Sequence, residues 1–368
     1  MKRTVMIRAI PLKLILILIS AILLVSCAGG TRTTEDRGGK TSGARGTQPG
    51  ETQPKVADYF PFIENLHMAY KGIGNEYAEY KTYVEYIKDN IMQVRNLNPG
   101  TNLAVVYEIK NGELRRVLNR GEVYHRYDYT ALKDDKEEVL LKEPIKVGTL
   151  WELKDGTKRS ITSLDKEIST PLGNYTALEV TSDGPYSVIT DYYVKDIGYV
   201  KRIFKSKEDD FTVTSELEKI ERNVPYKERI RIYFPDFNND KVAYINSEIA
   251  FLTNQDVEEV LEKAMKQVPE GSGLTGVFSD NTRILDIALD DNNDMVTVDL
   301  SSHFVTEMNA GTSLESMILK SVVNTFGEYF QKTRVKIKLE GKPYSSGHML
   351  MGPDDYFTVD TENTYEFK

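Results

Sequence analysis

The sequence predicts an α+β protein in which an antiparallel, β-rich domain precedes a second domain with two helices packed on a sheet. Apolar and polar residues alternate over most of residues 57–222, which is the period of a half-buried strand. Asn111 and Asp155 are each followed by glycine, the strongest short signal for a hairpin turn. Apolar residues at helical spacing then occur within 257–268 and 314–326. We therefore expect two folded domains of different kinds.

The first 27 residues indicate export. They contain Lys2, Arg3, Arg8 and Lys13 and no acidic residue. The uncharged segment LILILISAILLVS follows, which is shorter than the roughly 20 residues that a membrane-spanning helix needs. A basic segment followed by a short apolar one is typical of a signal peptide, so we exclude residues 1–27 from the fold.

The end of this segment, Leu24 to Cys27, resembles the lipobox of bacterial lipoproteins. The resemblance implies cleavage before Cys27 and attachment of diacylglycerol, with palmitate-type acyl chains, to its thiol. We therefore expect Cys27 to be a lipidation site and the protein to be anchored on the outer face of the cytoplasmic membrane. An ordinary secretory signal with a stray cysteine, or an uncleaved anchor, are the alternatives. Cys27 is the only cysteine, so the mature chain is expected to lack disulfides.

Residues 28–56 are expected to form a disordered tether. The stretch 28–55 has no aromatic or large aliphatic residue, so it cannot bury enough surface to offset the entropy of ordering. Its root-mean-square reach would be on the order of 30 Å. Removing the four basic residues of 1–27 changes the formal net charge from −9 to −13. Nucleic acid is therefore not an expected partner. Membrane attachment is expected through the lipid on Cys27 and not through the folded surface.

The β-rich domain is expected to span residues 57–222. We interpret residues 77–94 as strand, although the apolar spacing there also fits a helix. The turn from Thr170 to Tyr175 and the later YYVKDIGYVKRIF segment resemble the half-barrel domains of extracytoplasmic lipoprotein carriers. In those carriers the concave face holds acyl chains. The alternative is a closed apolar core without a ligand, and Trp151 is expected to lie in a core.

The second domain is expected after a boundary at residues 221–228, with Pro225 between clustered charges. Its pattern predicts the order ββαββαβ, with the helices against one face of a single sheet of about five strands. Thr253 is the expected cap of the first helix. The second helix is expected to begin at Thr312, with Glu315 in the capping-box position. Residues 347–368 are expected to be a C-terminal tail.

Four separated segments of this domain carry a family resemblance. They are, in order, IYFPD, MVTVDLSSHF, GTSLESMILKSVVNTFGEYF and VKIKLEGKP. Together they resemble the GerM-type sporulation and spore-germination domain, which we place at residues 226–346. The resemblance implies an α+β fold related to ring-building motifs of spore-envelope channel assemblies. No catalytic residues are known for that family, so the resemblance assigns none.

The residues that could carry chemistry do not assemble into a site in the sequence. Asp299, Ser301 and His303 stand too close along one strand to form a relay, and a nucleophile elbow is absent from the sequence. The acidic turns 236–240 and 290–294 lack the glycine and glutamate of a calcium loop. Histidines at ligand spacing and a cysteine for zinc are also missing. We therefore predict no catalytic, metal-binding or cofactor-binding residue, and a protein that is not an enzyme.

These observations predict a membrane-anchored, extracytoplasmic lipoprotein. We expect its GerM-type domain to act in assembly or protein–protein contacts at the cell envelope, in sporulation or germination where the cell makes spores. An envelope protein is the expected partner, and the chain could form oligomers. Lys336 and Lys338, on the outer face of the last predicted strand, would select an acidic partner. The alternative function is a binding protein whose β domain holds a lipid or a cell-wall ligand.

Overall fold

The computed structural model describes residues 53–135 and 137–368. Cys27 and most of the predicted tether lie outside these residues. Residues Thr52–Lys368 form one compact unit. Within it we distinguish a half-barrel domain, residues 53–222, and a C-terminal domain, residues 226–368.

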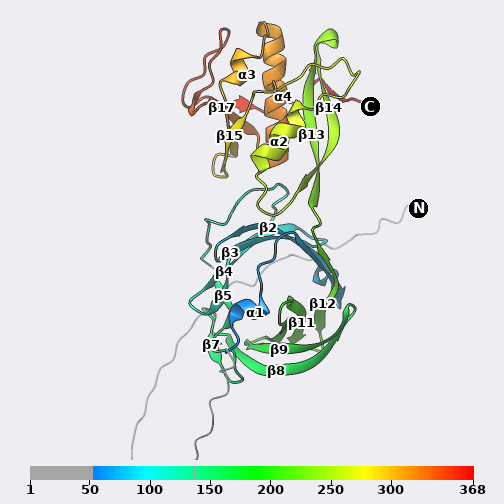
Figure 1. Cartoon of the computed structure of the whole chain (residues 1–368), viewed down its shortest axis with the longest axis vertical. Coiled ribbons are helices and arrows are strands. Elements are labelled where there is room, and N and C mark those ends of the chain that lie inside the picture. Colours follow the sequence, from blue (N-terminus) through cyan, green and yellow to red (C-terminus); the bar gives the residue numbers. More distant parts are fainter. Residues whose placement is uncertain (1–52, 136) are drawn as a thin grey trace, which may run out of the picture. The chain divides into compact units, whose positions relative to one another are not determined.

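The half-barrel domain is built on one antiparallel sheet, which confirms the predicted fold class. Its strands are β1 Leu66–Ile73, β2 Tyr80–Lys88, β3 Ile91–Leu97, β4 Asn102–Lys110, β5 Glu113–Arg120, β6 Glu138–Lys142, β7 Leu150–Glu152, β8 Lys158–Thr170, β9 Gly173–Asp183, β10 Ser187–Val194, β11 Gly198–Ser206 and β12 Thr212–Arg222. They pair in the order β6-β5-β4-β3-β2-β1-β12-β11-β10-β9-β8-β7. Figure 1 shows this sheet curving round a short helix, α1 Val56–Tyr59.

The outer strands β6 and β7 of this sheet are brought together by side chains. The Trp151 indole Nε1–H donates to the Val139 carbonyl at 3.0 Å. The Arg159 Nη1–H donates to the same carbonyl at 2.7 Å. We call this region, Val139 with Trp151 and Arg159, the seam. Trp151 is 7% exposed, so it does lie in a core, as the sequence predicted, and it also joins the two ends of the sheet.

Residues 80–88 and 91–94 lie in strands, as interpreted from the sequence, and Tyr77 and Ala78 lie in a short 3-10 turn. Strict alternation would place Tyr80, Thr82, Val84 and Tyr86 on one face, but the face changes within β2. A bulge between Val84 and Tyr86 shifts the pairing of β2 with β3. Tyr80, Thr82 and Val84 consequently line the concave side of the sheet, while Tyr86 contacts Arg126 outside it. A bulge inserts one residue and reverses the facing of those that follow, which a strict period of two cannot anticipate.

The convex side of β2 and β3 carries a fully buried ion pair. The Arg95 Nε–H donates to Glu85 Oε1 at 2.8 Å, and both side chains are 0% exposed. The two Nη groups of Arg95 donate to the carbonyls of Val123 and His125, at 2.6 Å each. These carbonyls belong to the loop between β5 and β6, which therefore covers this part of the sheet.

The C-terminal domain contains two sheets where the sequence predicted one. The elements are β13 Tyr226–Asp236, β14 Lys241–Phe251, α2 Val257–Lys266, β15 Ile284–Asp290, β16 Met295–Leu300, α3 His303–Thr306, α4 Thr312–Phe330, β17 Arg334–Leu339, β18 Lys342–Pro343, β19 Phe357–Thr358 and β20 Thr364–Glu366. A short 3-10 turn, Phe237–Asn239, joins β13 to β14, and another, Glu76–Ala78, lies between β1 and β2 of the half-barrel domain. One sheet has the order β13-β14-β20, and the other has β15-β16-β17-β18 with β19 on β17.

Helix α4 explains the division into two sheets. Apolar residues are buried beyond the predicted stripe, including Leu319, Val323 and Phe330. A helix that is apolar on several sides must be covered on several sides. Strands of both sheets pack on α4, and their side chains form one core with those of α2. The segment 347–368 contributes β19 and β20 to the two sheets.

The expected cap of α2 is not formed by Thr253. The residue before the helix is Asp256, whose side chain makes no capping bond. The Thr253 hydroxyl donates instead to the Val84 carbonyl, at 2.9 Å, and accepts from the Asn65 N–H, at 2.7 Å. Arg126 makes similar contacts, donating to the carbonyls of Leu252 and Glu85. Whether a chain beginning at residue 226 would fold without these contacts stays a prediction.

Candidate ligand-binding site

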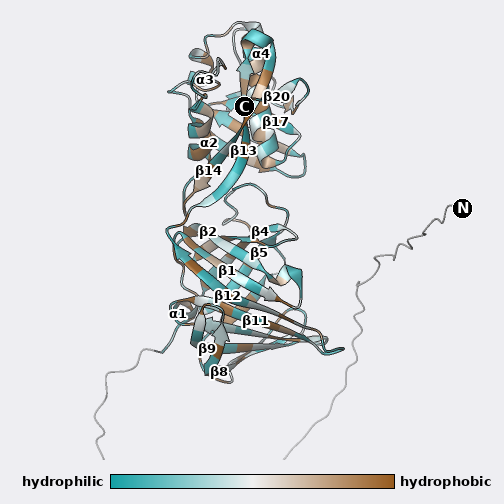
Figure 2. Cartoon of the chain, turned by 90° about the vertical axis from the view of Figure 1, so that its right-hand side faces the viewer, coloured by the Kyte–Doolittle hydropathy of each residue, from teal (hydrophilic) through white to brown (hydrophobic). Residues whose placement is uncertain are grey.

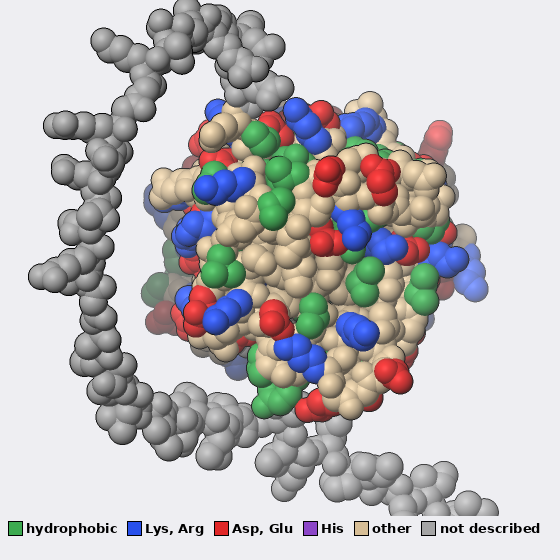
Figure 3. Space-filling view, turned by 90° about the horizontal axis from the view of Figure 1, so that it is seen from below, with side chains coloured by type: hydrophobic (Ala, Val, Ile, Leu, Met, Phe, Trp, Pro, Cys, Tyr) green, Lys and Arg blue, Asp and Glu red, His purple; other side chains and the backbone are tan. Residues whose placement is uncertain are grey.

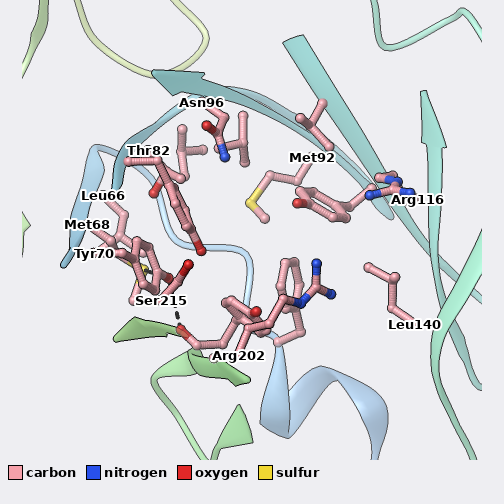
Figure 4. A pocket seen from close by; sticks show the side chains of 18 of the residues that line it. Leu66, Met68, Tyr70, Thr82, Met92, Asn96, Arg116, Leu140, Arg202 and Ser215 are labelled. Carbon is pink, nitrogen blue, oxygen red and sulfur yellow. Dashed lines mark hydrogen bonds between the residues drawn. The ribbon is translucent and has the colours of Figure 1, made fainter. Parts of the chain in front are cut away.

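The concave side of the half-barrel sheet borders a partly open cavity of about 360 Å³. Drug-sized and metabolite-sized ligands occupy pockets of roughly 300–1,000 Å³. The lining comes from strands β1 to β6 and β10 to β12, together with Phe60 and Pro61, which follow α1. Figure 4 shows these side chains pointing inward from the surrounding strands. We call this space the lumen.

One wall of the lumen is uncharged and carries most of its aliphatic side chains, with Thr82 and Asn96 as polar groups among them. Leu66 and Met68 of β1, Val84 of β2, and Met92 and Val94 of β3 lie there, and each is at most 9% exposed. In Figure 4 the Met92 thioether points to the middle of the space, with Leu66 and Met68 on the far side from Arg116 and Leu140. This wall can receive an alkyl chain, because it offers no charged group and a flexible methionine surface.

The other wall is aromatic and basic. Tyr107, Tyr193 and Tyr199 lie there with Arg116 of β5 and Arg202 of β11. The Arg202 guanidinium donates to both carboxylate oxygens of Asp191, at 2.7 and 3.0 Å. Arg116 is ion-paired with Glu138. The side chains of Arg116 and Arg202 are nevertheless 31% and 38% accessible, so both guanidinium groups present surface to the lumen.

The ionisation of these groups follows from burial. Burial raises the pKa of the Tyr107, Tyr193 and Tyr199 hydroxyls, so the phenols stay neutral hydrogen-bonding groups at physiological pH. Burial alone would lower the pKa of Arg202, but the charge of Asp191 outweighs it and raises that pKa. The Tyr70 hydroxyl donates to the Tyr199 carbonyl at 2.9 Å, which ties β1 to β11 across the lumen.

The outer surface is a weaker candidate for a ligand-binding site than the lumen. Figure 3 shows one face of the molecule with basic, acidic and apolar side chains interspersed and no large group of one kind. Figure 2 shows hydrophilic and hydrophobic residues alternating along the exposed strands of the half-barrel sheet. Isolated apolar residues on a surface are ordinary. The lumen is therefore the candidate site of this domain.

Comparison with known proteins identifies the second half of the chain. Residues 231–345 match the Germane family, which is described as sporulation and spore germination. These residues run from within β13 to just beyond β18, which includes α2, α4 and the core around them. Residues 231–345 are a GerM-type domain. The predicted resemblance is thereby confirmed.

Solved structures similar to the chain each cover less than half of it. The tandem GerMN domains of the Bacillus subtilis sporulation protein GerM are 17% identical, with a TM-score of 0.27 over 38% of this chain and 47% of that one. A Bacteroides fragilis protein described as exported, with a YmcC-like fold, is 14% identical, with a TM-score of 0.31 over 45% of this chain and 99% of that one. A Parabacteroides distasonis protein described as a lipoprotein is 15% identical, with a TM-score of 0.26 over 44% and 98%. No curated protein matches the chain in sequence.

Asp299, Ser301 and Ser302 of the GerM-type domain serve as local hydrogen-bond partners. Asp299 accepts from the Gly341 N–H at 3.0 Å. The Ser301 hydroxyl oxygen accepts from the Arg283 N–H at 3.0 Å. His303 begins α3. Ser302 donates to Glu340 at 2.6 Å. The three hydrogen-bonding side chains therefore fix strand ends and turns.

The two acidic turns also bond within the protein. In 236–240 the Asp236 carboxylate accepts from Asn239 and from the Tyr365 hydroxyl. In 290–294 Asp290 accepts from Asn293, and Asp291 pairs with Lys332. Across residues 53–135 and 137–368, the structure brings together no three His, Cys, Asp or Glu side chains that could hold a metal ion. The same residues contain no helix long and apolar enough to cross a membrane.

One expectation for the GerM-type domain needs correction. Glu315 does not form a capping box but is 3% exposed and accepts from Tyr344, Ser346 and His348. Because the partners come from the loop after β18, they could not be found by local spacing. Lys336 and Lys338 lie on the face of β17 opposite the buried Val335 and Ile337, and β17 is not an edge strand, since it pairs with β16 on one side and with β18 and β19 on the other. That these lysines select an acidic partner stays a prediction. The Lys336 ammonium donates to the Pro353 carbonyl at 3.0 Å.

Sequence reasoning did not find Arg116 and Arg202. They lie 86 positions apart in the chain and meet in the lumen only because β5 and β11 belong to one curved sheet. A signal existed at Arg116, which stands two residues after Leu114, a residue that is 0% exposed. A charged residue in phase with a buried apolar one indicates a polar group aimed at an interior.

Proposed function

We propose that the half-barrel domain binds a small amphipathic ligand in its lumen. The observation that carries the proposal is the partly open cavity of about 360 Å³, with most of its aliphatic side chains on β1 to β3 and a tyrosine- and arginine-rich wall opposite. A packed core has few voids larger than a water molecule, so a space of this size beneath a complete sheet indicates an occupant. A lipid or a lipid-linked cell-wall component has the matching two-part chemistry.

The proposal is tested by extracting bound molecules from the protein purified from its membrane, followed by mass spectrometry. Thr82 lines the lumen, and its neighbour Lys81 is exposed on the opposite face of β2. Thr82→Trp should fill part of the lumen and abolish the co-purified species, while Lys81→Trp should retain it. If the two variants and the wild type yield the same extract, or if the wild type yields no species, the lumen does not bind a ligand.

We further propose that the GerM-type domain makes protein contacts at the cell envelope and performs no turnover chemistry. Two observations favour this. Residues 231–345 match a family described by sporulation and spore germination, and Asp299 and Ser301 are engaged in separate local hydrogen bonds. Leu350, on the loop after β18, has the highest exposed fraction of the large apolar side chains among the described residues, 81%, so we choose it as the position at which to test the contact. In a bacterium that forms spores, the assembly would act during sporulation or germination.

This contact is tested by crosslinking intact cells and identifying the species joined to the protein. Leu350→Asp should reduce the yield of the crosslinked envelope protein, whereas Leu164→Asp, on the exposed face of β8, should not. Equal yields for both variants would place the contact elsewhere. A measurable enzymatic activity lost in Ser301→Ala or His303→Ala, with the fold intact, would contradict the proposal directly.

We also propose that a lipid on Cys27 holds the protein on the outer face of the cytoplasmic membrane. The support is the lipobox-like sequence and the charge balance of −13 that remains after residues 1–27, which disfavours adsorption to anionic lipid. Cys27→Ala should release the protein to the medium or leave the precursor uncut. A mature-sized variant that stays membrane-bound would show that the anchor lies elsewhere.

A further inference from the structure

The charged side chains that line the lumen are all positive. Among the described residues that line it, Arg116 and Arg202 are the charged ones, and both are cations. Their carboxylate partners, Glu138 and Asp191, stand behind them, and Asp191 is 1% exposed. The surface that a ligand would meet on this wall is therefore guanidinium and phenol, without a carboxylate.

One of the two carboxylates is shared with a third arginine. Glu138 Oε1 accepts from the Arg159 Nη2–H at 2.6 Å, while Glu138 Oε2 pairs with Arg116. Arg159 is 2% exposed and belongs to the seam. Three guanidinium groups thus meet two carboxylates. The three arginines at and behind this wall therefore exceed its two carboxylates by one.

We infer that the lumen selects an amphiphile with a single anionic head group, a carboxylate or a phosphate, whose head lies against Arg116 and Arg202 and whose chain lies along Leu66, Met68 and Met92. The inference rests on the proposed ligand-binding function. Arginine presents several N–H donors in a planar fork that matches the geometry of these two anions. The neutral hydroxyls of Tyr107 and Tyr193 border the same place and can donate as well.

The selection follows from the cost of burying charge. An anion that leaves water for an enclosed space needs a compensating cation, and this wall carries one more cation than its carboxylates neutralise. An uncharged head group would gain only ordinary hydrogen bonds. A cationic head group would be repelled by Arg116 and Arg202. Affinity should therefore fall from anionic to neutral to cationic heads at constant chain length.

The test uses three amphiphiles with the same chain. Dodecanoate, 1-monododecanoylglycerol and dodecyltrimethylammonium are titrated, below their micelle concentrations, into the compact unit Thr52–Lys368 in a calorimeter. The titrations are run at low salt and about pH 8, where the carboxylate is ionised. Dodecanoate should bind about tenfold more tightly than the glycerol ester, which corresponds to about 1.4 kcal/mol. Dodecyltrimethylammonium should bind the most weakly.

Arg116→Gln provides the decisive variant, because Glu138 keeps Arg159 as its partner and is not left unpaired. It should reduce the preference for dodecanoate to about threefold or less while it retains the binding of the glycerol ester. Arg116→Lys keeps the charge and should retain part of the preference. Arg115→Gln is the matched control, since Arg115 pairs with Glu113 and Glu137 and does not line the lumen.

The outcomes separate the inference from the function on which it rests. Equal affinities for the three head groups, or an undiminished preference in Arg116→Gln, would overturn the anionic selection and leave ligand binding intact. Failure of all three amphiphiles to bind the wild-type protein would overturn the binding function itself. A preference lost equally in Arg115→Gln would show that overall charge, and not the lumen wall, produces it.

Discussion

The half-barrel domain and the GerM-type domain use similar strands but fill the space beside them differently. In the GerM-type domain, α2 and α4 place Val, Leu, Ile, Met and Phe side chains between the sheets, and one continuous core results. In the half-barrel domain the curved sheet receives only the four residues of α1 and Phe60 to Phe62. The remaining space is the lumen. A domain filled by its own helices can act only through its surface, whereas a domain that leaves its concave side open can act from within.

The difference extends to how charge is held. In the lumen, Arg116 and Arg202 keep accessible surface, because a cavity lies in front of them. In the C-terminal domain Glu228 of β13 is 8% exposed and receives one hydrogen bond, from Tyr329, at 2.7 Å. Burial raises the pKa of Glu228 to about 7. The half-barrel domain thus keeps its two lumen arginines accessible, whereas burial in the C-terminal domain disfavours the charged form of Glu228.

We expect the largest effect on the free energy of unfolding at the ion pair of Glu85 and Arg95, which is fully buried in the half-barrel domain. Glu85→Gln leaves the Arg95 guanidinium buried without its carboxylate, which should lower the free energy of unfolding by about 3–5 kcal/mol. Glu113→Gln removes the carboxylate of a pair that is partly exposed, and should lower it by about 1 kcal/mol or less. Urea unfolding of both variants measures the difference. Similar losses of unfolding free energy in the two variants would mean that water reaches the Glu85–Arg95 pair on the convex side of the sheet.

Two methionines compare a filled core with the lumen directly. Met265 of α2 is 0% exposed in the core of the GerM-type domain, and Met92 is 5% exposed beside the lumen. Met265→Ala creates a new cavity and should cost about 3–5 kcal/mol. Met92→Ala enlarges an existing one and should cost about 2 kcal/mol. Chemical unfolding of the unliganded variants measures the two losses of unfolding free energy. A loss for Met92→Ala as large as that for Met265→Ala would show that the lumen wall packs like a core.

Glu228 makes the stability of the C-terminal domain depend on pH. The pKa of Glu228 is higher in the folded state, about 7, than in the unfolded state, about 4.5, so the folded state binds the proton more tightly. Its contribution is therefore lost as pH rises from about 4.5 to 7. Glu228→Gln, which mimics the protonated form, should equal the wild type near pH 4 and exceed it by on the order of 3 kcal/mol at pH 8.

The quantity to measure is the difference between Glu228→Gln and the wild type at each pH, by thermal or urea unfolding. Other groups titrate in the same range with the opposite sign. Burial lowers the pKa of His125 to about 3, so its contribution to stability grows as pH rises from about 3 to 6.5. A difference that stays constant from pH 4 to 8 would show that Glu228 is ionised in the folded protein throughout.

The smallest effect is expected at the seam. Trp151→Phe removes the indole donor to the Val139 carbonyl and should cost about 1 kcal/mol, the usual net value of one hydrogen bond. Because Trp151 is the only tryptophan, its fluorescence reports on the seam without interference. Wild-type emission should be that of a buried indole and should shift to the red on unfolding. An emission maximum of a solvent-exposed indole in the folded protein would contradict the closed seam.

The sequence predicted those features that depend on near neighbours. Hairpin turns such as Asn111-Gly112, the strands of the half-barrel and the two helices of the GerM-type domain follow from local period and turn chemistry. The motifs around MVTVDLSSHF led to the domain that the family match confirms. These signals depend on residues within one element or one turn, which a single sequence contains completely.

The features that the sequence did not predict depend on residues that are far apart in the chain. The bulge at Val84 reverses one face of β2, and no local pattern marks it. Glu315 has the spacing of a capping box but bonds to a loop about 30 residues later. The lumen itself requires that β1 to β6 and β10 to β12 close round one space and that no helix fills it. The sequence shows Arg116 and Arg202 as charged residues within strands, but it does not show that the two side chains meet in one cavity.

The most direct measurement is a crystal structure of the compact unit Thr52–Lys368 with ω-bromododecanoate, using the anomalous signal of bromine to place the chain end. Our account predicts a bromine peak within the lumen on the wall of Leu66, Met68 and Met92, with the carboxylate against the guanidinium groups of Arg116 and Arg202. A bromine peak outside the half-barrel sheet, or a molecule reversed so that the bromine lies at Arg116, would contradict it.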